Sequence, residues 1–295
     1  MTTLRTMDDG DMPEPQRRRW WSRIPLHAVL VIVSLIWLVP TVALLVSSFR
    51  PASDVNTSGW WNAFQLPFGF TMDNYTDVLS NNNLGQSFLN SLFISIPATV
   101  IPIMVAAFAA YAFAWMEFPG RNALFILVVA LLVVPLQSAL IPVLQLTTTV
   151  GLTGTFPAVW LAHTGFGLPF AIFLLRNFFG ALPKEMFESA YLDGASPTTA
   201  FFRLVLPLSV PAIASLVIFQ FMWVWNDLLV ALILVGGFPK VAPLTVTIAN
   251  MAGTLGQSWH LLTAAAFVSM VLPLIVFFSL QRYFVRGILG GSIKG

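Results

Sequence analysis

Residues 183–211 read PKEMFESAYLDGASPTTAFFRLVLPLSVP, a polar stretch between two long apolar segments. Its opening proline suits a first helical turn, and Gly194 suits the left-handed cap that ends a helix. Ser196 and Pro197 then provide an N-cap and a first helical position. The stretch therefore predicts two short helices, the second of which is stopped by Pro207.

The first of these helices is predicted to be amphipathic. Its apolar residues Met186, Phe187, Ala190 and Tyr191 recur at spacings of three and four, which gathers them on one face. Such a helix either rests on a membrane surface or presents a docking surface to another protein. The residue pattern by itself favours neither alternative.

The composition of the whole chain excludes most soluble classes. Hydrophobic residues make up 57% of the 295 residues and charged residues 9%, with a mean hydropathy of +0.83, whereas soluble domains are about one quarter charged. A disordered chain is excluded on the same ground, and a net charge of +2 makes no basic patch for nucleic acid. The absence of cysteine excludes a disulfide framework and a thiolate zinc site. A membrane protein remains.

Six apolar stretches are long enough to cross a bilayer as helices, which takes roughly 20 residues each. They lie near residues 25–49, 87–115, 122–147, 156–179, 208–235 and 261–284. The sequence therefore predicts an all-α membrane protein. It is divided into a tail at 1–24, a transmembrane domain at 25–286 that includes an inner loop at 180–207, and a second tail at 287–295.

The distribution of basic residues predicts the orientation of these spans. If the N-terminus is cytoplasmic, all but two of the 14 Lys and Arg residues fall on the inner side, and the exceptions are Arg50 and Lys240. The reverse orientation would violate the positive-inside rule. We therefore expect a multi-pass protein with both termini in the cytoplasm.

The inner loop also resembles a known motif. Glu188-Ser189-Ala190 is followed after three residues by Gly194 and after nine more by Leu204-Val205-Leu206-Pro207. The spacing matches the EAA loop of binding-protein-dependent ABC importer permeases, which reads E-A-A, three residues, G, nine residues, I-x-L-P. Ser189 and Leu204 are mild departures from that pattern. Over its whole length, including the run GGSIKG at 290–295, the chain resembles the smaller permease of maltose-type sugar importers and looks closest to the α-glucoside branch.

This resemblance implies a type I ABC importer permease fold in the bacterial cytoplasmic membrane. It also implies a second homologous permease, an ATPase homodimer, an extracytoplasmic solute-binding protein, and a sugar cargo such as the α-glucoside disaccharides trehalose or maltose. The inner loop would be a coupling helix that inserts into the ATPase. The resemblance assigns this role to Glu188, Ser189, Ala190, Asp193, Gly194, Leu204 and Pro207.

The chain itself carries no sign of an ATPase site. Its only lysines are Lys184, Lys240 and Lys294, and none follows the G-x-x-x-x-G-K-[ST] pattern of a phosphate-binding loop. We expect no catalytic residue, metal or cofactor in this chain, and ATP with Mg²⁺ at the partner ATPase.

Polar residues inside the predicted spans are candidates for the translocation path. Gln220, Trp223 and Asp227 fall at i, i+3 and i+7 of the fifth span, beside Asn226. Amide and carboxylate groups suit hydroxyls, and Trp223 suits the apolar face of a sugar ring. The alternative is an interhelical hydrogen bond that sets the packing. For His163 of the fourth span, a satisfied contact between helices is the expected role.

An outer segment at 245–259 has few charges and two glycines. By the resemblance, Asn250, Gly253 and Gly256 would reach the docked solute-binding protein, whereas the residues alone are equally consistent with a flexible connector. A stand-alone secondary transporter or channel is the alternative function. It is disfavoured because a single Asp within the spans offers little for ion coupling and no inverted repeat is visible.

Overall fold

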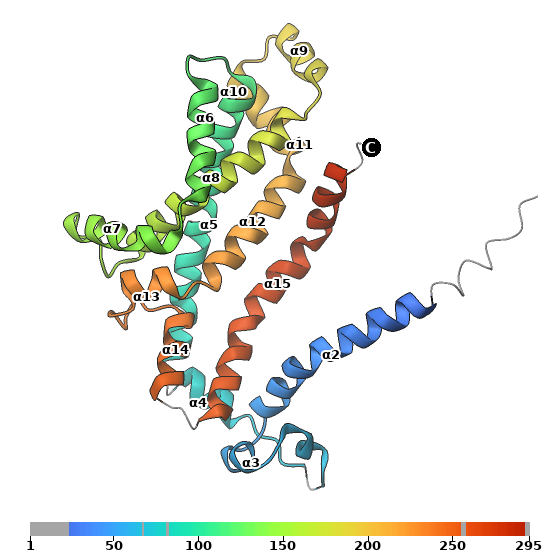
Figure 1. The fold of residues 1–295 in the computed structure, drawn as a ribbon, viewed down its shortest axis with the longest axis vertical. Coiled ribbons are helices and arrows are strands. Elements are labelled where there is room, and N and C mark those ends of the chain that lie inside the picture. Colours follow the sequence, from blue (N-terminus) through green and yellow to red (C-terminus); the bar gives the residue numbers. More distant parts are fainter. Residues whose placement is uncertain (1–23, 67, 81–82, 255–257, 293–295) are drawn as a thin grey trace, which may run out of the picture.

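The computed structural model describes residues 24–66, 68–80, 83–254 and 258–292, and every regular element in these ranges is helical (Figure 1). The elements are α2 (Ile24–Ser48), α3 (Ala52–Thr57), η1 (Trp60–Phe64), α4 (Asp73–Ser80), α5 (Leu84–Trp115), α6 (Arg121–Ala130), η2 (Leu131–Val133), α7 (Leu136–Thr149), α8 (Phe156–Gly180), α9 (Lys184–Leu192), α10 (Pro197–Ala200), η3 (Phe201–Val205), α11 (Leu206–Leu208), α12 (Val210–Trp225), α13 (Leu229–Val235), α14 (Leu244–Thr254) and α15 (Trp259–Ser292). The all-α architecture predicted from the sequence is confirmed.

Four of these helices, α2, α5, α8 and α15, are long and apolar enough to cross a membrane by themselves. Two further spans are bent pairs. One consists of α6 to η2 followed by α7, and the other of α10 to α11 followed by α12. Counted in this way, the described part of the chain contains six apolar spans by length and composition.

The stretch at 122–147 is not the straight helix expected from its hydropathy. The chain bends by 103° between Val133 and Leu136. Pro135 has φ −64° and ψ 128°, and Val134 before it is also extended. A residue that precedes proline is driven out of the helical region, so this proline separates η2 from α7 and leaves α7 protruding from the bundle (Figure 1).

The prediction of one continuous helix over 208–235 is wrong. The helix α12 ends at Trp225, and α13 begins only at Leu229. Both carboxylate oxygens of Asp227 accept backbone N–H groups at the start of α13, from Val230 at 3.2 Å and from Ala231 at 2.9 Å. A side chain that caps a helix in this way satisfies donors that have no partner in the helix. We call residues 226–228 the 226–228 break.

The second short helix of the inner loop also differs from its prediction. Its N-cap is Ser196, which accepts the N–H of Thr199, but helical structure continues past Pro207 to Leu208. The turn at 201–205 is π-helical. Such a widened turn changes the hydrogen-bond register, so Pro207 lies near the start of α11 and begins a new turn. The 73° bend into α12 follows at Ser209.

Two segments expected to be irregular are helical over part of their length. The outer segment at 245–259 contains most of α14, which buries Leu244, Val246 and Met251. Its β-branched residues, threonine among them, have low helix propensity, which explains why this helix was not predicted from the sequence. The segment at 287–295 was predicted to be a tail, but its first part is helical, because α15 continues to Ser292.

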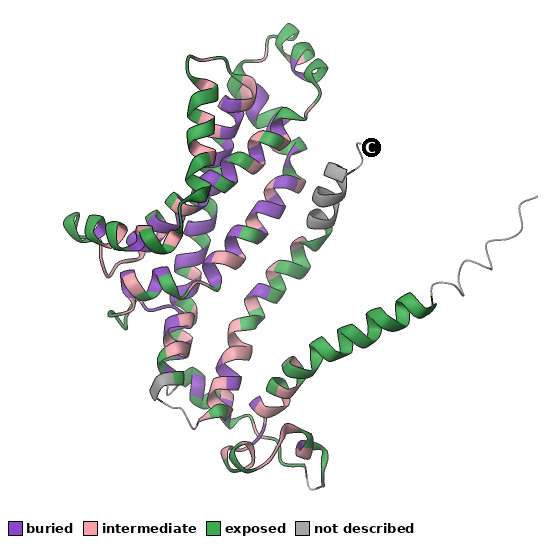
Figure 2. Cartoon of the chain, in the orientation of Figure 1, coloured by how far each residue is buried: buried purple, intermediate pink, exposed green. Residues whose placement is uncertain are grey.

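The centre of the fold is the pair α5 and α8, against which α12 packs, with α15 packed against α12. Small residues line the first contact: Ala98, Ala106 and Ala110 on α5 and Ala158 and Ala171 on α8 are all buried. Small side chains let two helix backbones approach closely, which is how helices associate without a hydrophobic driving force. Figure 2 shows the buried positions gathered on these helices, while α2 is exposed over most of its length.

Candidate coupling loop and translocation path

The α9 elbow, residues 183–196, is shaped by hydrogen bonds of its own backbone. Gly194 has φ +83°. Its N–H donates to the carbonyl of Tyr191 at 3.0 Å, and the next N–H, of Ala195, donates to the carbonyl of Ala190 at 2.9 Å. These two bonds form a Schellman motif, in which a left-handed residue closes the end of a helix. The predicted glycine cap therefore exists, and the turn it makes is locally encoded.

A stack of two aromatic rings attaches the α9 elbow to the bundle. The ring of Phe187, which is 2% exposed, lies on the ring of Trp115 with 3.7 Å between their centroids. The Trp115 indole N–H in turn donates to the Phe179 carbonyl of α8 at 3.0 Å. At the far side of the elbow, the Tyr111 hydroxyl donates to the Pro197 carbonyl at 3.0 Å. The elbow is thus attached to α5 and α8 and is not a free loop.

The outer edge of the α9 elbow stays uncovered. Met186 and Tyr191 are exposed, and Leu192 is 89% exposed. Of the predicted coupling residues, Ala190 and Leu204 are half-buried, and the remaining ones are exposed, namely Glu188, Ser189, Asp193, Gly194 and Pro207. The structure therefore separates one buried anchor, Phe187, from an apolar and acidic edge that is open for a partner.

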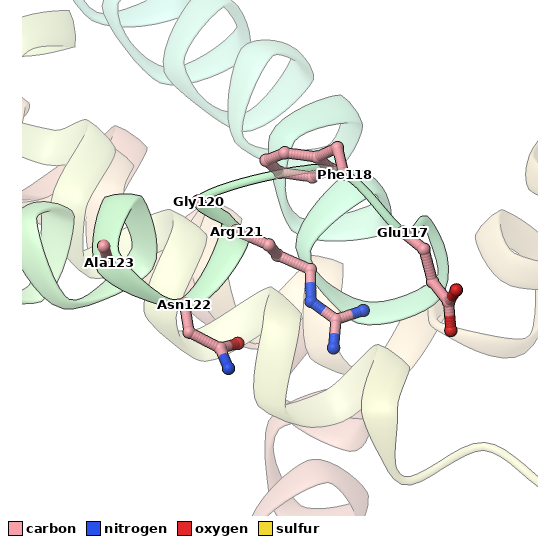
Figure 3. A pocket seen from close by; sticks show the side chains of 6 residues that line it. All are labelled: Glu117, Phe118, Gly120, Arg121, Asn122 and Ala123. Atoms are coloured by element: carbon pink, nitrogen blue, oxygen red, sulfur yellow. The ribbon is translucent and has the colours of Figure 1, made fainter.

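A shallow polar pocket of about 310 Å³ lies at the same end of the bundle, at the turn between α5 and α6 (Figure 3). Glu117, Phe118, Gly120, Arg121, Asn122 and Ala123 line it. Arg121 donates to the Met116 carbonyl at 3.0 Å, and Gly120 has φ +77°. This turn was not predicted from the sequence, although the Pro119-Gly120 pair ahead of a helix is a turn signal. It adds exposed polar groups to the end of the molecule that carries the α9 elbow.

Inside the bundle, Gln220 joins three helices. Its amide nitrogen donates to the Ala98 carbonyl of α5 at 3.1 Å. Its head group occupies the space beside Gly167 of α8, where an added Cβ would lie 2.7 Å from the amide oxygen. A larger residue at 167 would therefore displace Gln220. This role of Gly167 was not predicted from the sequence, although a glycine in an aromatic-rich span is a signal for a close approach.

Asp227 does not share a helical face with Gln220 and Trp223, because α12 ends before it. Besides capping α13, its Oδ2 lies 3.5 Å from His163 Nε2 of α8. His163 is a buried contact between helices, as expected, but it is not hydrogen-bonded, since neither ring nitrogen has a hydrogen-bond partner among the described residues. The Thr245 hydroxyl donates to the Asp227 carbonyl at 2.7 Å. The 226–228 break is thus fastened to α8 on one side and to α14 on the other.

No candidate metal site accompanies this break among the described residues. Nowhere in 24–66, 68–80, 83–254 or 258–292 do three His, Asp or Glu side chains converge on a position for a metal ion. Asn226 is exposed and donates to the Met222 carbonyl of its own helix at 2.7 Å. The assignment of these residues to a translocation path stays a prediction.

At the opposite end of the bundle, α14 is tied to α5. The Asn90 amide donates to the carbonyls of Lys240 and Ala242, each at 3.0 Å, and the Ser87 and Thr247 hydroxyls lie 2.7 Å apart. Asn250 of α14 lines a pocket of about 430 Å³ at this junction. Gly253 lies within α14, and Gly256 lies outside the described residues. Contact of these three with a binding protein stays a prediction.

The comparisons with known proteins agree on one family. The family described as "Binding-protein-dependent transport system inner membrane component" matches residues 87–290. The osmoprotective compounds uptake permease protein GgtD of Synechocystis sp. is 56% identical over 282 residues, which is 95% of each chain. The alpha-glucoside transport system permease protein AglG of Rhizobium meliloti is 57% identical over 234 residues, 78% of this chain and 62% of that relative. The trehalose transport system permease protein SugB of Mycobacterium tuberculosis is 33% identical over 88% of this chain and 93% of its own.

Among solved structures, a chain of a bacterial ABC transporter involved in the import of the acidic polysaccharide alginate superposes with a TM-score of 0.78 at 22% identity. The match covers 92% of this chain and 100% of that one. At this identity the likeness concerns the fold. Together with the family match over residues 87–290, it establishes that the chain belongs to the inner membrane components of binding-protein-dependent transport systems, the permeases of ABC importers, and has their type I fold.

Proposed function

We propose that this chain is the permease subunit of an ATP-driven importer that moves a neutral α-glucoside, such as trehalose or maltose, into the cytoplasm. The observation that carries the transport role is the α9 elbow, which is anchored through Phe187 and open along its outer edge. The names of two relatives, an alpha-glucoside permease and a trehalose permease, support the cargo. The name of a third, an osmoprotectant permease, supports a small compatible solute as the second candidate.

In this proposal the chain is not an enzyme and works in an assembly. A second, homologous permease completes the membrane part, an ATPase homodimer binds ATP and Mg²⁺, and a solute-binding protein delivers the sugar from outside. A second solved relative, a bacterial alginate ABC transporter with a pentasaccharide-bound periplasmic protein, supports the last partner. The α9 elbow then faces the cytoplasm of a bacterium, and both termini lie on that side, in agreement with the basic-residue distribution.

The α9 elbow suits the transmission of movement. An ATPase that closes on ATP can shift a permease only if its docked element is stiff and differs in position between two states. The Schellman motif fixes the shape of the elbow, and the stack of Trp115 on Phe187 joins it to α5. The exposed side chains Met186, Tyr191 and Leu192 would enter an apolar groove of the ATPase, with Glu188 at the rim.

Reconstitution of the complete complex tests this function. Proteoliposomes would contain both permeases and the ATPase, and the solute-binding protein would be added with maltose, trehalose or glycine betaine. We expect ATP hydrolysis and uptake to rise with one of the two disaccharides and not with glycine betaine. Stimulation by glycine betaine alone would identify the substrate as a zwitterionic osmoprotectant rather than a sugar. Uptake by this chain without the ATPase would instead establish the stand-alone transporter.

A single surface substitution tests the coupling role. We expect Glu188→Lys to lower sugar-stimulated ATP hydrolysis and uptake at least tenfold, because the reversed charge lies on the edge proposed to dock. The chain should still assemble with the second permease, since Glu188 is exposed and belongs to no buried contact. Unchanged uptake in the variant would contradict docking through this edge.

A further inference from the structure

An aromatic slot lies on the seam between α8 and α12. Each helix contributes residues at i, i+1 and i+4, and on each helix the i and i+4 residues are neighbours on one face. The slot has a volume of about 290 Å³ and is lined by Phe166, Gly167, Phe170, Phe219, Gln220 and Trp223. Four of its six residues are aromatic, and none is charged.

The amide of Gln220 forms the polar floor of the aromatic slot. It makes one hydrogen bond among the described residues, from its nitrogen to the Ala98 carbonyl. A primary amide has a second N–H and two acceptor lone pairs, so hydrogen-bonding capacity remains on the side of the slot. Gly167 leaves room for the head group, because a Cβ there would collide with both amide atoms.

Trp223 forms a wall of the slot in a defined orientation. The His163 ring meets it edge-on, with 4.9 Å between the ring centroids and 85° between the planes. His163 is itself fully buried and lies beside Asp227. Trp223 and Phe166 also line a larger apolar cavity of about 840 Å³, which extends along α7. The two cavities therefore adjoin each other at these residues.

This chemistry matches a neutral pyranose ring. The axial C–H groups of a sugar pack on aromatic faces, whose large apolar area supplies most of the contact, while a hydroxyl at the ring edge exchanges hydrogen bonds with an amide. A carboxylated or phosphorylated sugar would lose its hydration here without a counter-charge, which is costly. Aromatic faces also attract quaternary ammonium groups, but a quaternary nitrogen has no N–H to donate to the amide oxygen at the floor.

We propose that the aromatic slot is a sugar-ring subsite on the translocation path of this chain. The proposal rests on the function proposed above and adds that this permease, and not only its partner, contacts the cargo. It also revises the candidate path, because the contact residues come from two helices and Asp227 supports the wall rather than touching the ring.

Transport by the reconstituted complex gives the first test. We expect Trp223→Leu and Gln220→Leu to lower maltose or trehalose uptake per ATP hydrolysed at least tenfold, while ATP hydrolysis stimulated by the loaded binding protein stays within twofold of wild type. The matched control is Phe173→Leu, which removes an exposed ring of α8 outside the slot. Wild-type levels of uptake in both slot variants would overturn the subsite.

Protection of a reporter thiol gives the second test, which does not depend on the folding of the Trp223→Leu and Gln220→Leu variants. The natural chain has no cysteine, so Phe170→Cys and Phe173→Cys each introduce a single reactive group into this subunit. In the assembled complex, we expect a water-soluble thiol reagent to modify Phe170→Cys, and maltose or trehalose to slow that reaction at least fivefold. Phe173→Cys should show no such protection.

The outcomes of the thiol experiment separate the two proposals. If wild type transports neither disaccharide, the proposed function fails before the subsite is addressed. If wild type transports one of them but Phe170→Cys is unreactive or unprotected by it, the function stands and the subsite is wrong. If glycine betaine protects the thiol and neither disaccharide does, the slot binds a quaternary ammonium ligand and the sugar-ring assignment is wrong.

Discussion

The α9 elbow and the 226–228 break both redirect a helix, but they do so by different means. The elbow turns through backbone hydrogen bonds around Gly194, and its neighbouring side chains are exposed. The break turns through the carboxylate of Asp227, which caps α13 and lies against the buried His163. A turn in water can leave its remaining polar groups to the solvent, whereas a turn among apolar helices must satisfy them with protein groups.

The difference suits the proposed roles of the two regions. An exposed turn keeps its side chains available for docking, and its shape survives changes on its surface. A turn whose capping carboxylate is held by groups from α8 and α14 changes only when those helices change. We therefore expect substitutions at the break to affect the whole fold, and those at the elbow to affect coupling first.

The largest effect is expected from removal of the buried cap. Asp227→Leu would leave the N–H groups of Val230 and Ala231 without acceptors, and both residues are buried. Each unsatisfied buried donor costs about 1–3 kcal/mol, so the apparent melting temperature in detergent should fall sharply and transport should be lost. The matched variant Asp227→Asn keeps one acceptor oxygen and should change uptake only mildly.

The comparison of these two variants also decides what Asp227 does. If Asp227→Asn melts like wild type yet transports nothing, the carboxylate has a direct role in translocation and the cap is secondary. If both variants melt like wild type, the break is held by something other than this side chain.

The next largest effect concerns the anchor of the elbow. Phe187→Ala removes a ring that is 2% exposed and stacked on Trp115, and such truncations cost about 3–5 kcal/mol. We expect the α9 elbow to detach, with faster proteolysis within 183–196 and loss of sugar-stimulated ATP hydrolysis. Limited proteolysis of the intact complex measures the first change and an ATPase assay the second.

A control on the same helix separates anchoring from docking. Leu192→Ala alters a side chain that is 89% exposed, so its proteolysis rate should match wild type while coupling weakens. Equal proteolysis rates for Phe187→Ala and Leu192→Ala would contradict the anchoring role of the aromatic stack.

Sequence reasoning predicted the helical class, the stretches of membrane-crossing length and the two helices of the inner loop. These follow from hydropathy and from local caps such as Gly194 and Ser196, whose partners lie a few residues away. The glycine cap could be located because the residue that turns the chain and the atoms it satisfies belong to one segment.

The interior could not be predicted in the same way, because its decisive contacts join distant segments. The stretch at 208–235 is apolar on both sides of Asn226 and Asp227. Only the contacts of Asp227 with the distant segments of His163 and Thr245 show that it is held outside a helix. Gln220 likewise depends on Gly167 and Ala98, which belong to two other spans. Two residues of the aromatic slot, Gln220 and Trp223, were predicted from the sequence as candidates for the translocation path. The residues that α8 contributes could not be predicted, because they join the slot only through the packing of α8 against α12.

The smallest effect is expected at the exposed turn, where Gly194 has φ +83°. A Cβ at this position meets no other atom, so Gly194→Ala is penalised only by the left-handed backbone, at about 1–2 kcal/mol. We expect a modest loss of coupling, seen as fewer sugar molecules transported per ATP, with little change in melting temperature. Gly194→Asn is the matched control, because asparagine tolerates this conformation and can close a helix. It should behave almost as wild type, and if it fails as badly as Gly194→Ala, the partner must require the bare backbone of this residue rather than the turn it makes.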